Sequence, residues 1–403
     1  MERRAFVKLA GAAVAAGAGR TPAGFVTPRL EPSAVLQQPT LTPEVFTRRM
    51  QNAQQELQQR HLDLLIATPS TNFAYLTGYD PERSERLIAL LLPPDGAGLI
   101  VCPAFEVDRL KANTGITDFL PWQEAQDPYR LLRDWVRKPK FRGTAAIEPS
   151  TAYDTFLKLQ SGIGTWEYKD GAPIFERLRI VKTPAEIALI RRAVEITQAA
   201  MAATFGQLAE GQSEQEVARI LSREMENRGA PGGGLVQFGP DSALPHGGPT
   251  PTRLAREMPV LIDCGCRVSG YTSDITRTIW FGDSPTDEFK KVFNLVYDAQ
   301  TAVITSAKPV VSQAQDLDRA ARKVIADAGY GQYFTHRLGH GLGMDGHEVP
   351  YLVEGDEIRL ETGMVFTIEP GIYQPGKFGV RIEDDAQMTE NGVELLSTRP
   401  PKY

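Results

Sequence analysis

Cysteine is scarce in this 403-residue chain, which contains Cys102, Cys264 and Cys266 alone. Three cysteines cannot form a disulfide framework, so a small disulfide-held fold is excluded. Cys264 and Cys266 flank one glycine, whereas cysteine pairs that bind zinc usually have two or more intervening residues. We therefore expect both to be small buried side chains rather than metal ligands.

Basic clusters and long apolar runs are also scarce. Beyond the first residues no run rich in Lys and Arg occurs, and the formal net charge is -6. This balance argues against a nucleic-acid partner. Apolar residues make up 42% of the chain and charged residues 23%, which is typical of a globular protein. The length allows two domains with separate cores.

The N-terminus carries an export pattern. Arg3 and Arg4 precede a mildly apolar run, residues 9–18, made mostly of Ala and Gly. This arrangement is typical of a twin-arginine signal, with Ala16-Gly17-Ala18 as a candidate cleavage site, and predicts a periplasmic protein. The run is too short and too weakly apolar to span a membrane, so we expect no permanent anchor. The alternative is a disordered basic N-terminus.

The chain divides into three predicted parts. Residues 1–42 hold the signal and a Pro-rich linker without periodicity. Over residues 43–178 helical and strand-like segments alternate, which predicts a smaller α/β domain. This part lacks a cluster of His, Asp and Glu suited to chemistry, so we interpret it as a supporting or oligomerising domain and expect a homodimer or larger homo-oligomer. Residues 179–403 group helices and strands in blocks, which predicts an α+β domain built on antiparallel strands.

Two helix starts open this last part. Thr183-Pro184-Ala185-Glu186 places a capping Thr before Pro and a Glu at the third helical position, and residues 213–216 repeat the capping box. The glycine triplet 232–234 precedes an expected strand at 235–238. Neither a Lys-Ser/Thr pair nor a helix start follows it, so we interpret it as a hinge or tight turn rather than a phosphate loop.

The first candidate metal ligands lie within residues 260–281. An apolar strand ends in Asp263, and a second strand rich in β-branched and aromatic residues carries Asp274. With a turn centred between residues 268 and 269 the two acids lie opposite each other and repel, so a cation is expected between them. An oxygen-rich site suits Mn²⁺, with Mg²⁺, Zn²⁺ and Co²⁺ as competitors. The alternative is a pair of exposed aspartates.

A second predicted hairpin repeats this arrangement. An apolar strand over residues 364–369 ends in Glu369, a strand over 379–384 bears Glu383, and Gly376 is equidistant from the two acids. The two hairpins would thus present four carboxylates. Bridging carboxylates are the usual way to hold two metal ions close together, where a shared water becomes a nucleophile near neutral pH.

Three of the five histidines fall within residues 335–348, among glycines that let the backbone pass close to a site. His340 is the expected imidazole ligand beside the four acids. His336 alone has the features of a supporting or packing residue. A zincin helix is not predicted, because Gly339 and Gly341 make a helix improbable here.

The order of these residues resembles the Xaa-Pro peptidase family (aminopeptidase P and prolidase), which has the pita-bread fold. The resemblance covers roughly residues 180–388 and rests on the strings ALPHGGP, IDCGC, SDITRT, GHGLGMDGHE, TIEPGIY and VRIEDD. Residues 72–78 (NFAYLTG) are similar to the creatinase-like N-terminal domain of that family. The resemblance implies an antiparallel sheet-and-helix domain with internal pseudo-symmetry. It also implies two divalent metal ions, commonly manganese or cobalt, and cleavage of the Xaa-Pro bond in dipeptides or at peptide N-termini.

The resemblance also assigns roles. Asp263 would chelate one metal ion, His340 and Glu369 would hold the other, and Asp274 and Glu383 would bridge the two. Glu369 would also shuttle a proton from the attacking water to the leaving prolyl nitrogen. The residues expected to contact the substrate or its oxyanion are His246, His336, His347, Tyr373 and Arg381. Of these His246 and His347 are the expected catalytic histidines, and Arg381 could also orient a carboxylate from the strand face that carries Glu383.

Two alternative functions are also compatible with the sequence. Creatinase-like hydrolases share the fold but lack the full metal set, so the five retained ligands count against them. A lyase on the same scaffold is not excluded by ligands alone. A catalytically inactive relative that only binds peptides or partners would be expected to have lost metal ligands or His347, and this chain has lost neither.

Overall fold

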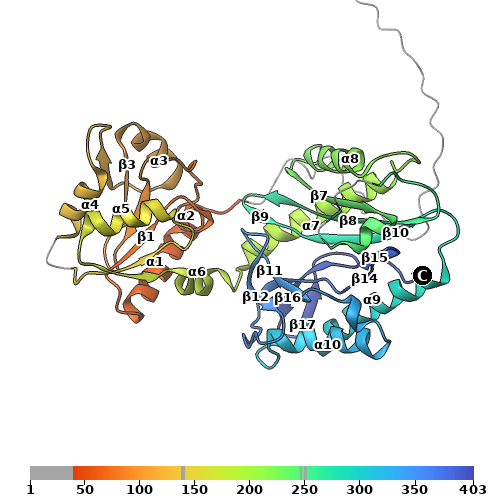
Figure 1. Cartoon of the computed structure of the whole chain (residues 1–403). Helices are drawn as coiled ribbons and strands as arrows, with labels where there is room; N and C mark the ends of the chain where they lie inside the picture. Colours follow the sequence, from red (N-terminus) through yellow and green to blue (C-terminus); the bar gives the residue numbers. More distant parts are fainter. Residues whose placement is uncertain (1–39, 138–140, 246, 249–251) are drawn as a thin grey trace, which may run out of the picture.

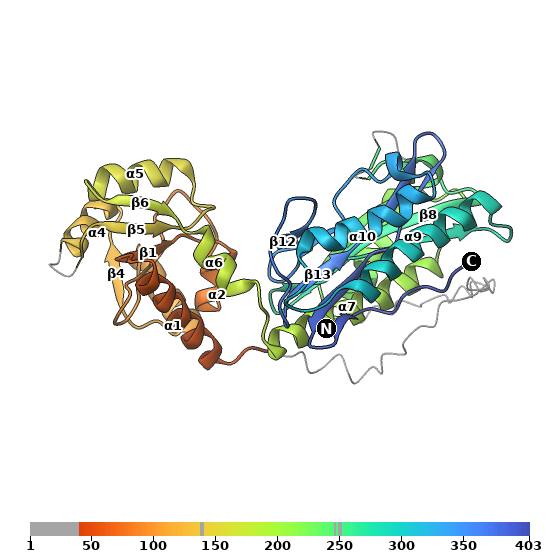
Figure 2. The same cartoon turned by 90° about the horizontal axis from the view of Figure 1, so that it is seen from below.

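The computed structural model describes residues 40–137, 141–245, 247–248 and 252–403 (Figure 1). The expected signal, with Arg3 and Arg4, lies outside these residues, as does His246. Two lobes lie side by side in both views (Figures 1 and 2). In the described part of the chain no helix has the length and apolar character needed to cross a bilayer.

The N-terminal lobe, residues 43–179, is built on a six-stranded sheet with strand order β4-β3-β2-β1-β5-β6. The sheet is mixed, because β1 pairs antiparallel with β2 and parallel with β5. The strands are β1 (Leu64–Ala67), β2 (Ala89–Leu92), β3 (Leu99–Pro103), β4 (Phe119–Trp122), β5 (Thr144–Ile147) and β6 (Glu167–Asp170). The helices are α1 (Pro43–Gln59), α2 (Thr71–Thr77), η2 (Ala104–Glu106), α3 (Val107–Thr114), α4 (Pro128–Val136), α5 (Tyr153–Ile163) and α6 (Ala172–Arg179).

Strand β1 shows how this lobe buries its core. Leu65 and Ala67 pack into an apolar cluster with α1, α2 and α6, whereas Leu64 and Ile66 pack into a second cluster with α4 and α5. Successive side chains of a strand point to opposite faces, so one apolar strand joins both helical layers. The predicted alternation of helices and strands is confirmed in this lobe.

Three elements of this lobe have weak sequence patterns for physical reasons. Strand β4 contains Pro121, which lowers the strand signal, and β6 is a polar edge strand with largely exposed side chains. Helix α2 is buried on all sides, so it has no amphipathic periodicity. The residues at its two ends are nevertheless typical of a helix, since Ser70 caps the first turn and Gly78, in the left-handed conformation, ends the helix.

The C-terminal lobe, residues 184–403, contains the sheets β10-β8-β7 and β12-β11-β13-β16-β17 and the pair β14-β15. Its described strand pairs are antiparallel, as expected for an α+β domain. The helices are α7 (Pro184–Phe205), α8 (Glu214–Glu226), η3 (Gly239–Ala243), α9 (Asp287–Ser306), α10 (Ala314–Asp327) and η4 (Gly331–Tyr333). The strands are β7 (Gly232–Phe238), β8 (Met258–Val268), β9 (Tyr271–Thr272), β10 (Ile275–Phe281), β11 (Gly339–Gly341), β12 (Glu348–Leu352), β13 (Val365–Ile368), β14 (Gly371–Gln374), β15 (Phe378–Arg381), β16 (Asp384–Thr389) and β17 (Gly392–Leu395).

The C-terminal lobe repeats one plan. Helices α7 and α8 pack on β7, β8 and β10, and helices α9 and α10 pack on the later strands. The second helix of each pair begins at a capping box, at Ser213 and Gln313. Each of these two residues also forms an isolated backbone β-bridge with a later arginine. The predicted capping box of Thr183 and Glu186 at α7 is confirmed. This repetition agrees with the expected internal pseudo-symmetry.

The glycine triplet 232–234 is not a hinge, as the sequence suggested, but the first part of β7. Gly234 pairs with Cys264, and a Cβ at Gly234 would lie 2.0 Å from the Asp263 carbonyl oxygen. Glycine is therefore required because β7 approaches the strand that carries Asp263 too closely for any side chain. Cys264 and Cys266 are buried free thiols, as predicted.

Candidate metal centre

The first hairpin has a different register from the one predicted. Strand β8 does not end at Asp263 but continues to Val268, and Asp263 pairs with Thr276 rather than with Asp274. The turn lies one residue later than predicted, at Ser269 and Gly270, which both have positive φ. Asp274 therefore lies diagonally to Asp263. Because the partner moves by two residues, an even number, both acids still face the same side of the sheet.

The second hairpin has the predicted register. Ile368 pairs with Asp384 and Gly371 pairs with Arg381, so the same register runs through both strand pairs. Glu369 and Glu383 lie in the gap between these pairs and keep that register. The Glu369 amide donates to the Leu338 carbonyl and the Glu383 amide donates to the Thr276 carbonyl. The second hairpin is thus joined to the first directly beside the acids.

The expected ligands converge in three overlapping groups of side chains whose ligand atoms lie within 4.8 Å of one another. One group contains Asp263, Asp274 and Glu383, a second contains His340, Glu369 and Glu383, and a third contains Asp274, His340 and His347. Asp274, Glu383 and His340 each belong to two groups, and of these three only the two carboxylates have two oxygens with which to bridge two ions. This is the arrangement expected of two neighbouring metal sites that share bridging carboxylates.

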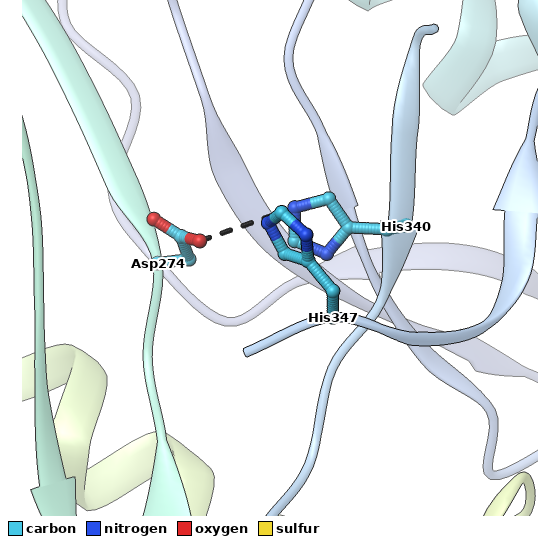
Figure 3. Close-up of side chains that lie close together, drawn as sticks. All are labelled: Asp274, His340 and His347. Carbon is cyan, nitrogen blue, oxygen red and sulfur yellow. Dashed lines mark ion pairs between the residues drawn. The ribbon is translucent and has the colours of Figure 1, made fainter. Parts of the chain in front are cut away.

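Figure 3 shows Asp274 from the first hairpin facing His340 and His347, which come from the opposite side of the site. The His340 and His347 ring centroids are 3.9 Å apart. His347 is exposed, whereas His340 is buried in β11. His347 therefore lies at the open edge of the site, where a substrate could reach it. Arg337 lies beside it, with Nη2 3.3 Å from His347 Nδ1.

Burial sets the protonation of the imidazole. The His340 Nδ1 donates to the Gly341 carbonyl at 3.1 Å, which leaves Nε2 facing Glu369 at 3.4 Å and Asp274 at 3.9 Å. Burial, followed by the charge of His347, lowers the pKa of His340 to about 3. The ring is therefore neutral at physiological pH with Nε2 as its free lone pair, which is the form that binds a metal ion.

The positive charge near the candidate ligands is too small to balance their carboxylates. Burial raises the pKa of Asp274 and of Glu383 well above the ordinary range, and neighbouring carboxylates add to the rise. Burial also raises the pKa of Glu369 to about 8. Arg381 opposes these shifts without cancelling them. A donor set of these three acids, the Asp263 carboxylate and one neutral imidazole fits divalent cations, which would restore the charge balance.

Arg381 lies behind the ligands. Its Nη2 donates to Asp263 Oδ2 at 2.6 Å, its Nε to Thr276 Oγ1 at 3.0 Å and its Nη1 to the Tyr373 hydroxyl at 2.7 Å. The same hydroxyl lies 2.8 Å from His336 Nε2. Arg381 and Tyr373 are each only 3% exposed. This geometry fits the expected orienting role of Arg381 and links Arg381, Tyr373 and His336 in a supporting chain, whereas their contact with substrate stays a prediction.

Sequence reasoning missed two supporting residues, Thr276 and Asp385. The Thr276 hydroxyl donates to Glu383 Oε2 at 2.5 Å, and Asp385 Oδ2 accepts from the Asp274 backbone amide at 3.0 Å. Each lies two residues after a candidate ligand, and side chains two apart share a strand face. That period could have identified both from the sequence.

We expect replacement of Arg381 by Lys to weaken the site. Lysine keeps the charge but cannot reach Asp263, Thr276 and Tyr373 together, so Asp263 loses its fixed orientation. Loss of such support typically costs 10- to 100-fold in metal affinity or activity, and we expect a fall of about that size in kcat/KM. Tyr373→Phe, which removes one of the three hydrogen bonds, should cost less. An Arg381→Lys enzyme with wild-type metal affinity and kcat/KM would contradict the orienting role.

The metal-free protein should lose stability as pH rises. The folded-state pKa of Glu369, about 8, lies above its ordinary value of 4.5, so folding takes up a proton. The contribution of Glu369 to the free energy of unfolding is therefore complete below its ordinary pKa and is lost as pH rises through its folded-state pKa. The Glu369 contribution to the Tm of chelated protein should therefore fall between about pH 5 and pH 8, opposed below about pH 6.5 by His340, whose lowered pKa acts with the opposite sign. Glu369→Gln should flatten this slope, whereas a Tm that rises equally in both proteins would contradict it.

Two models of known protein families match this chain. Residues 188–390 match the model of metallopeptidase family M24, and residues 49–181 match that of the Creatinase/Prolidase N-terminal domain. An uncharacterised peptidase of Staphylococcus aureus is 37% identical over 346 residues, which covers 85% of this chain and 96% of that protein.

Solved structures of similar fold include two peptidases. Prolidase from Thermococcus sibiricus has a TM-score of 0.81 and 34% identity, covering 88% of this chain and 97% of its own. X-Pro aminopeptidase from Thermotoga maritima has a TM-score of 0.77 and 31% identity, covering 88% and 98%. These similarities span both lobes and the candidate metal centre.

Proposed function

This chain belongs to metallopeptidase family M24, with a Creatinase/Prolidase N-terminal domain, and we propose that it hydrolyses Xaa-Pro peptide bonds with two divalent metal ions. The observation that carries the proposal is the overlap of the ligand groups, in which Asp274 and Glu383 are each shared. Shared carboxylates favour a pair of ions over a single ion.

The chain supplies the residues that would hold these ions. Asp263 lies on one side of the shared acids, and His340 and Glu369 lie on the other. Bound ions would polarise the scissile carbonyl and lower the pKa of a water molecule, so that it attacks near neutral pH. Manganese suits the oxygen-rich donor set and is our proposed ion, with Co²⁺ and Zn²⁺ as competitors.

Glu369 is the proposed proton carrier. Burial raises the pKa of its carboxyl to about 8, which supports a role in taking up and releasing a proton, and bound cations would lower that value. The nitrogen that leaves an Xaa-Pro bond is the prolyl nitrogen, which must gain a proton as the bond breaks. Glu369 would take the proton of the attacking water and deliver it to that nitrogen.

His347 is the proposed contact to the substrate carbonyl. It is exposed at the edge of the site, its ring lies against His340, and Arg337 lies beside it. A hydrogen bond from His347 to the oxyanion would strengthen as negative charge develops there. His246, which the structure does not describe, is proposed for the same pocket on the family pattern alone.

A peptide panel tests this function. The Mn²⁺-loaded protein should cleave Ala-Pro or Ala-Pro-Ala between Ala and Pro and leave Ala-Ala and Ala-Ala-Ala far less affected. Preference for the dipeptide would make it a prolidase-type dipeptidase, and preference for the tripeptide an aminopeptidase. Failure on both proline peptides in metal-loaded protein would overturn the proposal.

Export and assembly are proposed on the sequence pattern. We propose that the twin-arginine pattern delivers the folded, metal-loaded protein to the periplasm, and that the protein forms a homodimer or larger homo-oligomer. Replacing Arg3 and Arg4 by Lys should block export, measured by fractionation, while leaving expression intact. Light scattering on the mature protein measures the assembly, and a monomer at all concentrations would contradict the second proposal.

A further inference from the structure

The segment that carries His347 is held from two sides: Thr272 and Arg267 of the catalytic sheet donate to the Gly343 and Met344 carbonyls, and its acidic side chains are held from outside that sheet. We call residues 343–348 the His347 segment. It connects β11 with β12, and His347 lies between two acids of this segment, Asp345 and Glu348. The amide of Asp345 donates to Glu348 Oε1 at 2.9 Å, so the two acids are tied to each other. Contacts to these acids therefore fix the backbone on either side of His347.

Arg179, at the end of α6, contacts both acids. Its Nη2 donates to Asp345 Oδ2 at 2.6 Å and also to Glu348 Oε1. Its Nη1 donates to Asn72 Oδ1 in α2 at 2.6 Å. The side chain is only 11% exposed. A guanidinium that serves three partners in a nearly buried position fixes geometry, because its planar fork limits the alternatives.

The N-terminal lobe adds a direct contact of its own. The Thr71 hydroxyl of α2 donates to Asp345 Oδ1 at 2.6 Å. Asn72, whose Oδ1 accepts the hydrogen bond from Arg179, also donates from its Nδ2 to Glu148 Oε2 at 3.0 Å. The position of Asp345 is therefore set by residues of the N-terminal lobe, which sequence analysis treated only as a supporting domain.

The charges reinforce this network. Glu348 is buried, and its Oε2 also accepts from Lys182 Nζ at 3.2 Å. Burial alone would raise the pKa of Glu348, but Lys182 and Arg179 outweigh it and lower that pKa below its ordinary value. Glu348 is thus an ionised acid between two cations. Removing one cation leaves its charge less compensated, so the segment should relax to a new position.

We propose that Arg179 is a positioning residue for His347, and that through it the N-terminal lobe sets the geometry of the catalytic site. This inference rests on the proposed function, in which His347 contacts the substrate. Arg179 does not touch the expected metal ligands in the described contacts, so its effect should fall on substrate alignment rather than on metal binding.

Arg179→Ala tests the proposal against a matched control. We expect kcat/KM for the proline peptide to fall about 100-fold, the cost of a misplaced catalytic group, with unchanged metal content. Arg177→Ala is the control, since Arg177 lies on the same helix, is 57% exposed and pairs only loosely with Glu361 at 3.8 Å. Thr71→Ala removes one hydrogen bond to the segment and should give a smaller fall even if Arg179→Ala folds poorly.

A double-mutant cycle separates positioning from general destabilisation. If Arg179 acts through His347, Arg179→Ala should cost little in a His347→Ala background, whereas a purely structural effect would persist at full size. Arg179→Lys, which can keep one of the contacts, should restore part of the activity. Additive losses in the cycle would overturn the proposal.

Hydrogen exchange decides the proposal independently of catalysis. Amides of residues 344–348 should exchange faster in Arg179→Ala than in wild type or Arg177→Ala, while β8 and β10 keep their protection. Unchanged exchange in the segment would overturn the positioning role even if the peptide activity is confirmed. A wild-type protein inactive on proline peptides but with the expected exchange pattern would overturn the proposed function alone.

Discussion

Asp274→Asn is expected to abolish cleavage of proline peptides while the protein stays folded. Asp274 is shared by two ligand groups, so the loss of its charge affects both expected metal sites. Its backbone amide still donates to Asp385, and asparagine has nearly the same shape as aspartate, so the hairpin should keep its geometry. We expect kcat/KM to fall by at least about a thousand-fold, as large as or larger than the loss of an oxyanion-hole donor.

The matched control for this variant is Asp287→Asn. Asp287 is fully exposed at the start of α9 and lies 3.9 Å from Lys290, so its charge should matter little. Circular dichroism and Tm check the fold of both variants, and metal analysis should show fewer bound ions in Asp274→Asn alone. A variant that retains activity at normal metal content would exclude Asp274 as a bridging ligand.

Removal of metal is the second change expected to abolish activity. Without cations these buried acids hold protons, because burial raises the pKa values of Asp274, Glu369 and Glu383, and they lack the metal ions that would activate a water at neutral pH. A chelated protein should therefore be inactive and should recover on addition of Mn²⁺. Because two ions are expected, activity should level off near two equivalents per chain.

This titration has two informative failures. Full activity in protein shown to be metal-free would exclude metal-dependent hydrolysis. Full recovery at one equivalent, with no further binding, would favour a mononuclear site and remove the bridging roles of Asp274 and Glu383. Parallel titration of Arg381→Lys would show whether the supporting chain affects the first or the second ion.

Local pattern was sufficient to predict which acids face the site. Side chains alternate along a strand, so Asp263 and Asp274 share a face even though the predicted register was wrong by two residues. The turn itself was misplaced because Ser269 is a non-glycine residue with positive φ, which a sequence does not announce. The second hairpin was predicted correctly because Gly376, with φ of +74°, marks its turn.

Close backbone approach was not predictable from local pattern. The glycine triplet suggested a hinge, because glycine is permissive in turns and strands alike. Its actual role depends on β8 lying directly against it, with the Asp263 carbonyl 2.0 Å from any Cβ at Gly234. Only the pairing of β7 with β8 in the folded protein distinguishes a glycine hinge from a glycine strand that allows close backbone approach.

Contacts between the lobes were also beyond the sequence. Glu186 was predicted as a capping residue, and it is one, but its Oε1 also accepts from Arg49 Nη2 at 2.8 Å and from the Tyr271 hydroxyl at 2.6 Å. Arg49 comes from α1 and Tyr271 from the hairpin that carries the candidate ligands. These contacts join residues 137 and 85 positions apart, so no local period could reveal them. The Arg179 network has the same origin.

We propose that five side chains hold two metal ions, namely Asp263, Asp274, His340, Glu369 and Glu383. Anomalous diffraction at the manganese edge from crystals of the Mn²⁺-loaded protein tests it most directly. We expect two peaks about 3.5–4 Å apart, with Asp274 and Glu383 contacting both ions. A single peak, or two peaks that either of these acids fails to bridge, would contradict it.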